Sequence, residues 1–168
     1  MTLAEINALD RAAFVAALGG VFEHSPWIAE DAWARRPFAS VDALHAAMTA
    51  VVRASGKAKQ LALLRAHPEL AGKAMVRREL TVDSSREQSG AGLTECSPEE
   101  FARLQALNAR YTAKFGFPFV LAVKGHDRAG ILREFARRVE HEPDAELVEC
   151  LVQVEKIARL RIDALVAG

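Results

Sequence analysis

Apolar residues recur at helical spacing along most of the chain. Val41, Leu44, Met48 and Val51 fall three or four positions apart and would lie on one face of a helix over residues 41–55. Other stretches show the same period, and polar residues that favour helix N-caps stand before them. The predicted starts are Thr2, Asp10, Ser25, Ser40, Ser84, Ser97, Asp127 and Asp144, with a further helix over residues 57–66.

One apolar stretch does not follow this period. The run FGFPFVLAV contains Pro118, which lacks a backbone donor and interrupts any helix. We therefore expect a short extended segment near Phe117–Val123. The sequence shows no alternation of strands with helices and no internal repeat. Residues 1–168 are accordingly predicted to form a single compact all-α domain of roughly eight helices.

The composition is that of an ordinary globular protein. Of the 168 residues, 51% are apolar and 26% are charged, and 22 Lys and Arg balance 22 Asp and Glu. Such a balance gives no overall attraction to nucleic acid or to a membrane surface, so neither is an expected partner. No apolar run approaches the length that spans a bilayer, and the first residues lack the apolar core of a signal peptide.

Cysteine and histidine usage bears on the compartment and on metal binding. Cys96 and Cys150, the only cysteines, lie far apart in the sequence, which favours two free thiols in a reducing compartment. The last residues are not the Ser-Lys-Leu peroxisomal signal, so we expect a cytoplasmic protein. The histidines, at positions 24, 45, 67, 126 and 141, share no ligand-like spacing, so no metal site is expected.

His67 stands at a predicted helix end, directly before Pro68. One interpretation is a solvated histidine, which the helix dipole favours at a helix C-terminus. The other is a general acid–base imidazole at a corner whose backbone freedom the proline restricts. The residue pattern alone leaves both interpretations open.

The stretch that begins at Ser84 also has two interpretations. Ser84 and Glu87 have the spacing of a capping box, in which the serine caps the helix and the glutamate reaches back. The same residues, with Gln88, place polar groups beside a helix N-terminus, where anions bind readily. Gly90 and Gly92 each lower the helix propensity by up to about 1 kcal/mol relative to alanine, which indicates that close backbone approach matters here.

Arg161 falls within an apolar stripe of the last predicted helix. That stripe consists of Leu147, Leu151, Val154, Ala158 and Leu165. In one interpretation the aliphatic part of the Arg161 side chain packs against the core and its guanidinium reaches water. In the other the guanidinium is buried and needs an anionic or carbonyl partner. Glu155 and Asp163 lie on other faces of the helix, so a ligand is one candidate for that partner.

The segment Phe117–Val123 raises a similar question about its backbone. Its side chains suit a core, but an extended segment outside any sheet leaves N–H and C=O groups that need partners. A planar heterocycle with amide-like edges is one source of such partners.

Three motifs, AHPELAGK at 66–73, LTVDSSREQSGAGL at 80–93 and FGFPFVLAVKG at 115–125, together resemble the OHCU decarboxylase family. The similarity extends to NARY at 108–111 and IARLRI at 157–162, so it covers most of the chain in order. Members of the family act on 2-oxo-4-hydroxy-4-carboxy-5-ureidoimidazoline. The resemblance implies a cofactor-free decarboxylation to (S)-allantoin, the last step of urate breakdown, on an all-helical homodimeric scaffold.

The resemblance also implies roles for individual residues. His67 matches the catalytic histidine of the family, and Glu87 matches its essential acid. The implied substrate-binding residues are Pro68, Ser84, Ser85, Arg86, Glu87, Gln88, Phe119, Val120, Leu121, Ala122, Val123 and Arg161. Among these, Phe119–Val123 are expected to meet the substrate through backbone edges. The sequence departs from the family pattern at Glu69 and Asp83, where Asp and Glu respectively are more frequent.

The implied small-molecule substrate explains why no cofactor is expected. Its ring C=N accepts the electrons released as CO2 leaves, so neither a metal, pyridoxal phosphate nor thiamine is needed. Our hypothesis gives proton transfer to His67, with the Glu87 carboxylate directed into the pocket near it. Two alternatives stay open: a non-catalytic helical module that binds a ureide or a protein, and a related lyase acting on another heterocyclic acid.

Overall fold

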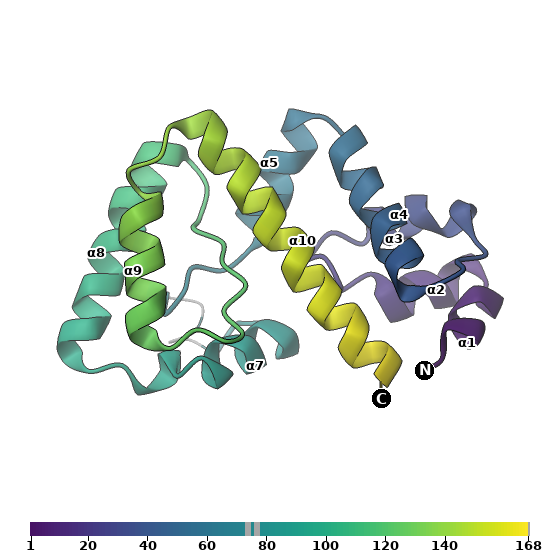
Figure 1. Cartoon of the computed structure of the whole chain (residues 1–168), viewed down its shortest axis with the longest axis horizontal. Helices are drawn as coiled ribbons and strands as arrows, with labels where there is room; N and C mark the ends of the chain where they lie inside the picture. The colour runs from purple at the N-terminus through teal and green to yellow at the C-terminus, as the bar shows by residue number, and fades with distance from the viewer. Residues whose placement is uncertain (73–74, 76–77, 168) are drawn as a thin grey trace. The chain divides into compact units, whose positions relative to one another are not determined.

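The structure, a computed structural model, describes residues 1–72, 75 and 78–167, so Lys73, the last residue of the first motif, lies outside the described residues. None of the described residues belongs to a β-strand. Their helices are α1 (Leu3–Ala8), α2 (Arg11–Leu18), α3 (Trp27–Ala32), η1 (Trp33–Arg35), α4 (Val41–Ala54), α5 (Lys57–Ala66), α7 (Val82–Gly90), η2 (Leu93–Glu95), α8 (Pro98–Phe115), α9 (Arg128–Arg138) and α10 (Pro143–Ala167). The all-α prediction is confirmed, with nine α-helices in this described part against roughly eight expected (Figure 1).

Most of the predicted N-caps are confirmed. Each capping side chain accepts a hydrogen bond from the backbone N–H three residues further on, which satisfies a donor that the first helical turn leaves unpaired. These caps are Thr2, Asp10, Ser40, Ser97 and Asp127. At Thr2 and Ser97 the capping box is complete, because Glu5 and Glu100 accept hydrogen bonds from the N–H of the capping residue.

Two predicted helix starts are wrong, by one residue in α3 and by two residues in α10. Helix α3 has Pro26 at its cap position, and the Ser25 hydroxyl donates instead to the Glu23 carbonyl at 2.9 Å. Helix α10 begins at Pro143, so Asp144 lies inside its first turn. A proline has its φ angle already fixed near the helical value. Both helices therefore start from the proline rather than from the polar residue beside it.

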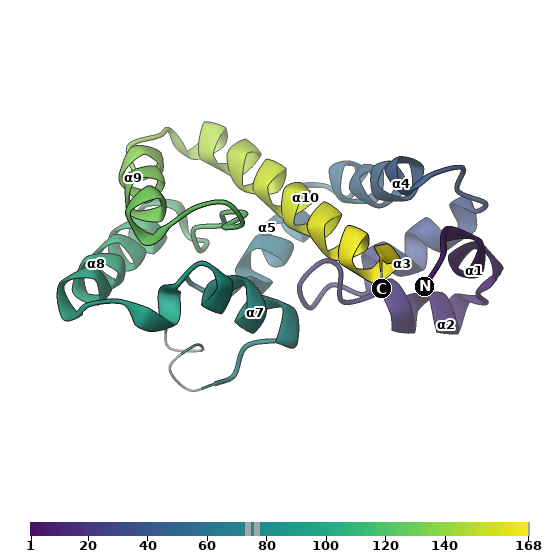
Figure 2. The ribbon, with the colours of Figure 1, turned by 60° about the horizontal axis from the view of Figure 1, so that its bottom comes forward.

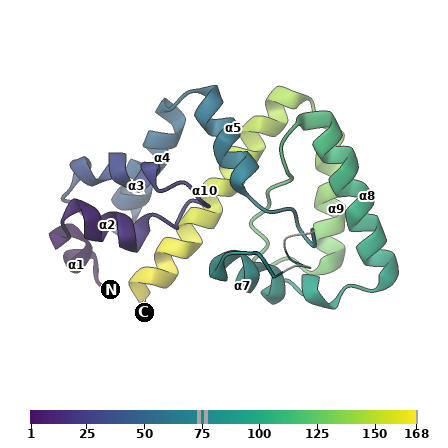
Figure 3. The same cartoon turned by 180° about the vertical axis from the view of Figure 1, so that it is seen from behind.

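The contacts of the chain divide it into two compact units. Unit 1 contains residues 1–66 and 154–168, and unit 2 contains residues 67–153, so α10 contributes residues to both. Within unit 1, α3 packs against α2 and α4, and Met1 donates through its terminal ammonium to the Leu165 carbonyl at 3.3 Å (Figure 2). Within unit 2, α8 and α9 lie side by side (Figure 3). No linker in the sequence marks this division.

Unit 2 has an aromatic core around Tyr111 of α8. The Tyr111 ring meets the rings of Phe117, Phe119 and Phe135 edge-on, with centroid distances of 6.1, 5.5 and 5.8 Å. The Phe119 ring stacks on that of Phe135 at 3.9 Å. Because Phe117 and Phe119 belong to the segment between α8 and α9, these contacts fix that segment to both helices.

A buried ion pair lies beside this aromatic core. Arg138 of α9 donates to Glu146 Oε1 at 2.7 Å and to the Val120 carbonyl at 2.6 Å. The Arg138 guanidinium also lies 4.4 Å from the centre of the Phe119 ring, and Tyr111 donates to the same Glu146 oxygen at 2.6 Å. Both charged side chains are fully buried. Each charge therefore depends on the other and on these hydrogen bonds.

Replacing Arg138 with Met should lower the free energy of unfolding by about 3–5 kcal/mol, because the Glu146 carboxylate would stay buried without its cation. Urea unfolding measures this difference. The matched control is Arg110→Met on α8, whose ion pair with Glu140 is exposed on both sides and should matter little. Equal unfolding midpoints for the two variants would contradict this account of the buried pair.

Candidate functional site

His67 is the first residue after α5 and the first residue of unit 2. The helix ends at Ala66 as predicted, because a proline disfavours the helical conformation in the residue before it. Only 8% of the His67 surface is exposed. A solvated histidine at a helix end would be exposed, so this burial argues against that interpretation and leaves the imidazole inside the fold.

The helix that carries Ser84 and Glu87 begins earlier than the sequence predicts. Its N-cap is Thr81, whose hydroxyl oxygen accepts from the Ser84 N–H at 3.2 Å. Ser84 is thus inside the first turn, and the predicted capping box of Ser84 and Glu87 is wrong. The Thr81 backbone has the extended conformation of a cap, with φ −60° and ψ 160°, and its side chain satisfies a first-turn donor. The N-cap of this helix therefore does not depend on the Glu87 carboxylate.

The corrected start also decides which residues of α7 share a face. Ser84 and Gln88 are 4% and 3% exposed, and Glu87 between them is half-buried. Residues separated by three and four positions lie on one side of a helix, so these three form its inward face. Ser85 and Arg86 are exposed to solvent on the other side. The structure thus brings together three of the five predicted residues of this stretch.

Gln88 joins α7 to the loop that follows His67. Its Oε1 accepts from the Ala71 N–H at 2.9 Å, and its Nε2 donates to the Glu69 carbonyl at 3.2 Å. The amide oxygen and one amide hydrogen are therefore bound within the protein, which leaves one N–H for any ligand. Gln88 directly follows Glu87 in α7. These two hydrogen bonds therefore fix the part of α7 that carries the predicted acid against the loop that follows His67.

The segment 117–123 runs from α8 to α9 without helix or strand, as the sequence predicts (Figure 3). Helix-borne side chains bind two of its backbone groups. The Val120 carbonyl accepts from Arg138, and the Ala122 N–H donates to Gln153 Oε1 at 3.0 Å. The Val123 carbonyl also accepts from the His126 N–H at 3.0 Å, so three of the backbone groups that were expected to meet a ligand are bound within the protein.

Leu121, between those two residues, differs from them. It is buried, and within the described part of the chain neither its N–H nor its carbonyl has a hydrogen-bond partner. In an extended chain the N–H and C=O of one residue point to the opposite edge from those of its two neighbours, so the extended segment expected from the sequence would direct the Leu121 groups away from Arg138 and Gln153. That edge offers a planar ligand an unpaired donor and an unpaired acceptor.

Arg161 belongs to unit 1 and is buried, with 8% of its surface exposed. Its Nη1 donates to Glu23 Oε2 at 2.7 Å and to the Gly20 carbonyl at 3.2 Å. The sequence does not identify the partner of Arg161, and a ligand was one candidate. The structure supplies Glu23, which is itself only 1% exposed. Glu23 was missed because its place in the apolar stretch VFEHSPW is the only sign of its burial.

The described residues include no group of three or more His, Cys, Asp or Glu side chains that would hold a metal ion. Burial raises the pKa of both free thiols, Cys96 and Cys150, so neither has the character of a nucleophilic thiolate. In the same part of the chain no helix is long and apolar enough to cross a membrane.

Comparisons with known proteins agree in one family. A family model described as OHCU decarboxylase matches residues 7–163. The 2-oxo-4-hydroxy-4-carboxy-5-ureidoimidazoline decarboxylase of Mus musculus is 42% identical over 168 residues, which cover 100% of this chain and 94% of the mouse protein. The decarboxylase of the same name from Haloferax volcanii is 44% identical over 96% of this chain and 94% of its own length. A crystal structure of (S)-allantoin synthase has a TM-score of 0.77 and 30% identity, over 99% of this chain and 54% of that chain.

Replacing Glu23 with Leu should lower the free energy of unfolding by about 3–5 kcal/mol, because the Arg161 cation would stay buried without this carboxylate. The double replacement of Glu23 and Arg161 with Leu should recover much of that loss, since neither charge remains. Urea unfolding of the unaltered chain, both single variants and the double variant gives the interaction free energy between the two residues.

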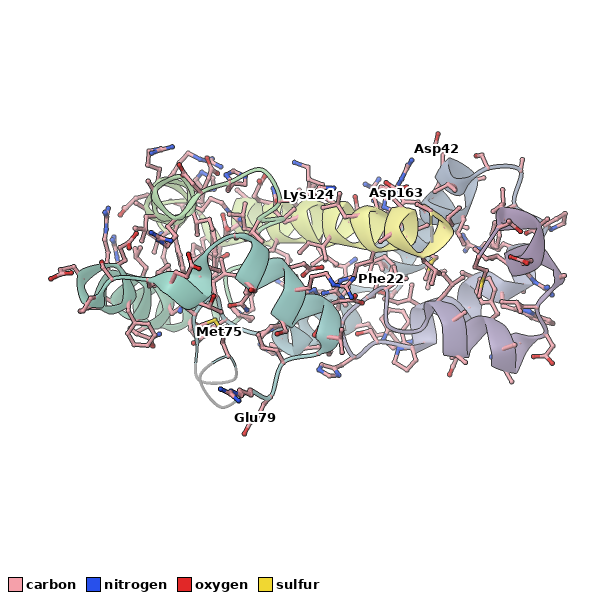
Figure 4. All side chains as sticks on the ribbon, turned by 90° about the horizontal axis from the view of Figure 1, so that it is seen from below. Phe22, Asp42, Met75, Glu79, Lys124 and Asp163 are labelled. Carbon is pink, nitrogen blue, oxygen red and sulfur yellow. The ribbon has the colours of Figure 1, made fainter. Side chains whose placement is uncertain are left out.

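The control for this cycle is Asp42→Leu. Asp42 and Asp163 point outward from unit 1, where both accept hydrogen bonds from Arg159 (Figure 4). Exposed pairs of this kind contribute little, so the control should unfold like the unaltered chain. If the losses of the two single Glu23 and Arg161 variants simply add in the double variant, the coupling is absent and this account of the pair fails.

Proposed function

The chain belongs to the OHCU decarboxylase family, and we propose that it converts 2-oxo-4-hydroxy-4-carboxy-5-ureidoimidazoline to (S)-allantoin with release of CO2, the last step of urate breakdown. The observation that carries this proposal is the family match over residues 7–163, which includes residues of both units. The same match supports treating residues 1–168 as one functional domain. The mouse and Haloferax relatives are both named as decarboxylases of this substrate.

The proposed reaction requires no cofactor. As the bond from the hydroxyl-bearing ring carbon to the carboxylate breaks, its electron pair moves toward the ring C=N and leaves an enol between the two ring carbons. The hydroxyl then loses its proton and becomes a ring carbonyl, while one proton is added to the neighbouring carbon that carries the ureido group. The protein has to hold the carboxylate out of the ring plane and stabilise the enolate-like intermediate. It also has to deliver the proton to one face, which sets the S configuration. Side chains and backbone N–H groups are sufficient for these tasks.

His67 transfers the proton at the substrate hydroxyl and carbon, and Glu87 orients the imidazole and exchanges protons with it. Two observations support these roles. His67 is buried, as an imidazole that works away from bulk water should be. Gln88, directly after Glu87, bonds to the loop directly after His67. Because Thr81 is the cap of α7, the cap makes no demand on the Glu87 carboxylate that would conflict with catalysis.

The remaining predicted residues bind the substrate. Ser84 and the second N–H of Gln88 hold carbonyl and ureido groups from the inward face of α7. The backbone of Phe119–Val123 binds the planar edge of the substrate, chiefly through Leu121, whose peptide groups have no partner in the described structure. Arg161 binds a ring carbonyl or the carboxylate. Pro68 is a further proposed contact. Ser85 and Arg86 are proposed from the resemblance alone, because both face away from the inward side of α7.

The location and assembly of the protein are also proposed. Two free cysteines support a reducing compartment such as the cytoplasm. A homodimer is proposed from the resemblance to the family. Size-exclusion chromatography with light scattering would then give twice the mass of one chain. These two proposals do not affect the assignment of the reaction.

Replacing His67 with Asn or Glu87 with Gln should reduce the rate of (S)-allantoin formation by about 10²–10⁴-fold, the usual contribution of a positioned general acid or base. Circular dichroism on freshly generated substrate follows the product, because the uncatalysed decay gives a racemate without signal. The controls are His126→Gln and Glu99→Gln, which change the same residue types at positions without a proposed role and should keep the full rate.

Two results would count against the proposed function. Full activity of the His67→Asn variant would remove His67 from the mechanism. Equal rates of signal development with and without the unaltered chain would remove the decarboxylase assignment and favour a module that only binds a ureide or a protein.

A further inference from the structure

The loop after His67 contains a strained residue. Ala71 has a φ of 50°, in the left-handed region that residues with a Cβ rarely adopt. Such a conformation persists only when the surrounding structure enforces it. The enforcement here includes Gln88, which binds the Ala71 N–H and the Glu69 carbonyl.

Two amides from α8 bind the same loop. Gln105 donates to the Ala71 carbonyl at 2.6 Å, and Asn108 donates to the Leu70 carbonyl at 2.9 Å. Gln105 and Asn108 are three positions apart, so they project from the same face of the helix. With Gln88 they bind three successive carbonyls of the loop and one of its N–H groups. We call these three side chains the amide clamp.

Asn108 binds the loop through its amide donor alone. The side chain is 3% exposed, and its Oδ1 has no hydrogen-bond partner in the described structure. A buried acceptor without a partner costs free energy. Turning the amide over would not help, because Oδ1 would then face the Leu70 carbonyl, a second acceptor. The chain therefore keeps Asn108 for its donor to the loop and carries an unsatisfied oxygen with it.

We propose that the amide clamp positions the His67 imidazole for proton transfer, and that Asn108 and Gln105 are positioning residues of the reaction. The inference rests on the catalytic role proposed for His67. The clamp fixes the backbone of residues 69–71. Pro68, which lies between His67 and that stretch, has its own φ angle fixed by its ring. A displacement of about 1 Å in a catalytic group is enough to cost about 10²-fold in rate. Neither Asn108 nor Gln105 is a proposed contact of the substrate.

The first test replaces Asn108 with Leu, which has a similar volume and no polar atoms. The turnover number should fall by about 10²-fold and KM by no more than a few-fold in either direction. The fraction of (S)-allantoin in the product, corrected for uncatalysed decay, should fall as well, because a displaced imidazole delivers its proton less selectively. The free energy of unfolding should fall by about 1–3 kcal/mol, because the buried Leu70 carbonyl loses its partner, and removal of the unsatisfied oxygen offsets part of that loss.

Asn7→Leu is the matched control. Asn7 in unit 1 also binds a loop backbone with its amide, donating to the Phe38 carbonyl at 2.9 Å and accepting from the Phe38 N–H at 2.8 Å. Both of its polar atoms are paired, so this variant should lose more stability than Asn108→Leu and still keep its turnover number. A purely structural role for Asn108 predicts the opposite order of the two effects on turnover.

A second variant gives a readout that depends on the donor itself. In Asn108→Asp the introduced carboxyl can donate to the Leu70 carbonyl only when it is protonated, and burial raises the pKa of such a group. The turnover of this variant relative to the unaltered chain should therefore rise as the pH falls. A constant ratio across the pH range in which the chain is folded would contradict the proposal.

The outcomes separate this inference from the proposed function. If His67→Asn is inactive and Asn108→Leu keeps turnover within about threefold of the unaltered chain, the amide clamp does not position His67, whereas the catalytic assignment stands. If His67→Asn is fully active, the catalytic assignment fails and the inference fails with it. If Asn108→Leu does not fold, Gln105→Met on the partly exposed side of the clamp replaces it, with the same expected loss of turnover and the same threshold for rejection.

Discussion

A buried peptide group has to be paired, and in unit 2 this constraint acts on backbone that no helix contains. Residues 68–72, which follow His67, and the segment 117–123 are both largely buried, and neither belongs to a helix or a sheet. Side chains of the neighbouring helices supply the missing partners. The amide clamp binds the first of these stretches, and Arg138 with Gln153 binds the second. The position of both stretches is therefore set by helix-borne side chains, and of these only Gln88 is also a proposed contact of the substrate.

The same constraint explains the two buried ion pairs. Arg138 reaches the Val120 carbonyl only by being buried, and Glu146 makes that burial tolerable. Arg161 is held in a similar way by Glu23 within unit 1. A buried ion pair is weak evidence for stability, since packed apolar residues are often as stable. Its value here is geometric, because each guanidinium is held in one orientation with at least one donor on a backbone carbonyl.

Sequence reasoning predicted the helices well, because caps, prolines and apolar periods are local signals. It failed where two local signals competed, because Thr81 and Ser84 are both residues that can cap a helix. In the structure Thr81 is the cap, and Ser84 and Gln88 are buried on the inward face of the helix. The site residues were predicted chiefly through resemblance, since residue patterns left each of them open. Glu23, Asn108 and Gln153 were missed, because their roles depend on partners 31 to 138 positions away in the chain.

The central claim is that helix-borne side chains hold these non-helical stretches as firmly as a helix would. Amide hydrogen exchange followed by NMR tests it directly, because within the described residues the Ala71 and Ala122 N–H groups are bound by the side chains of Gln88 and Gln153 and not by a helix or sheet. The account predicts that both amides exchange as slowly as the buried amides of α8. Exchange of either amide as fast as that of exposed loop residues such as Lys124 and Gly125 would contradict it.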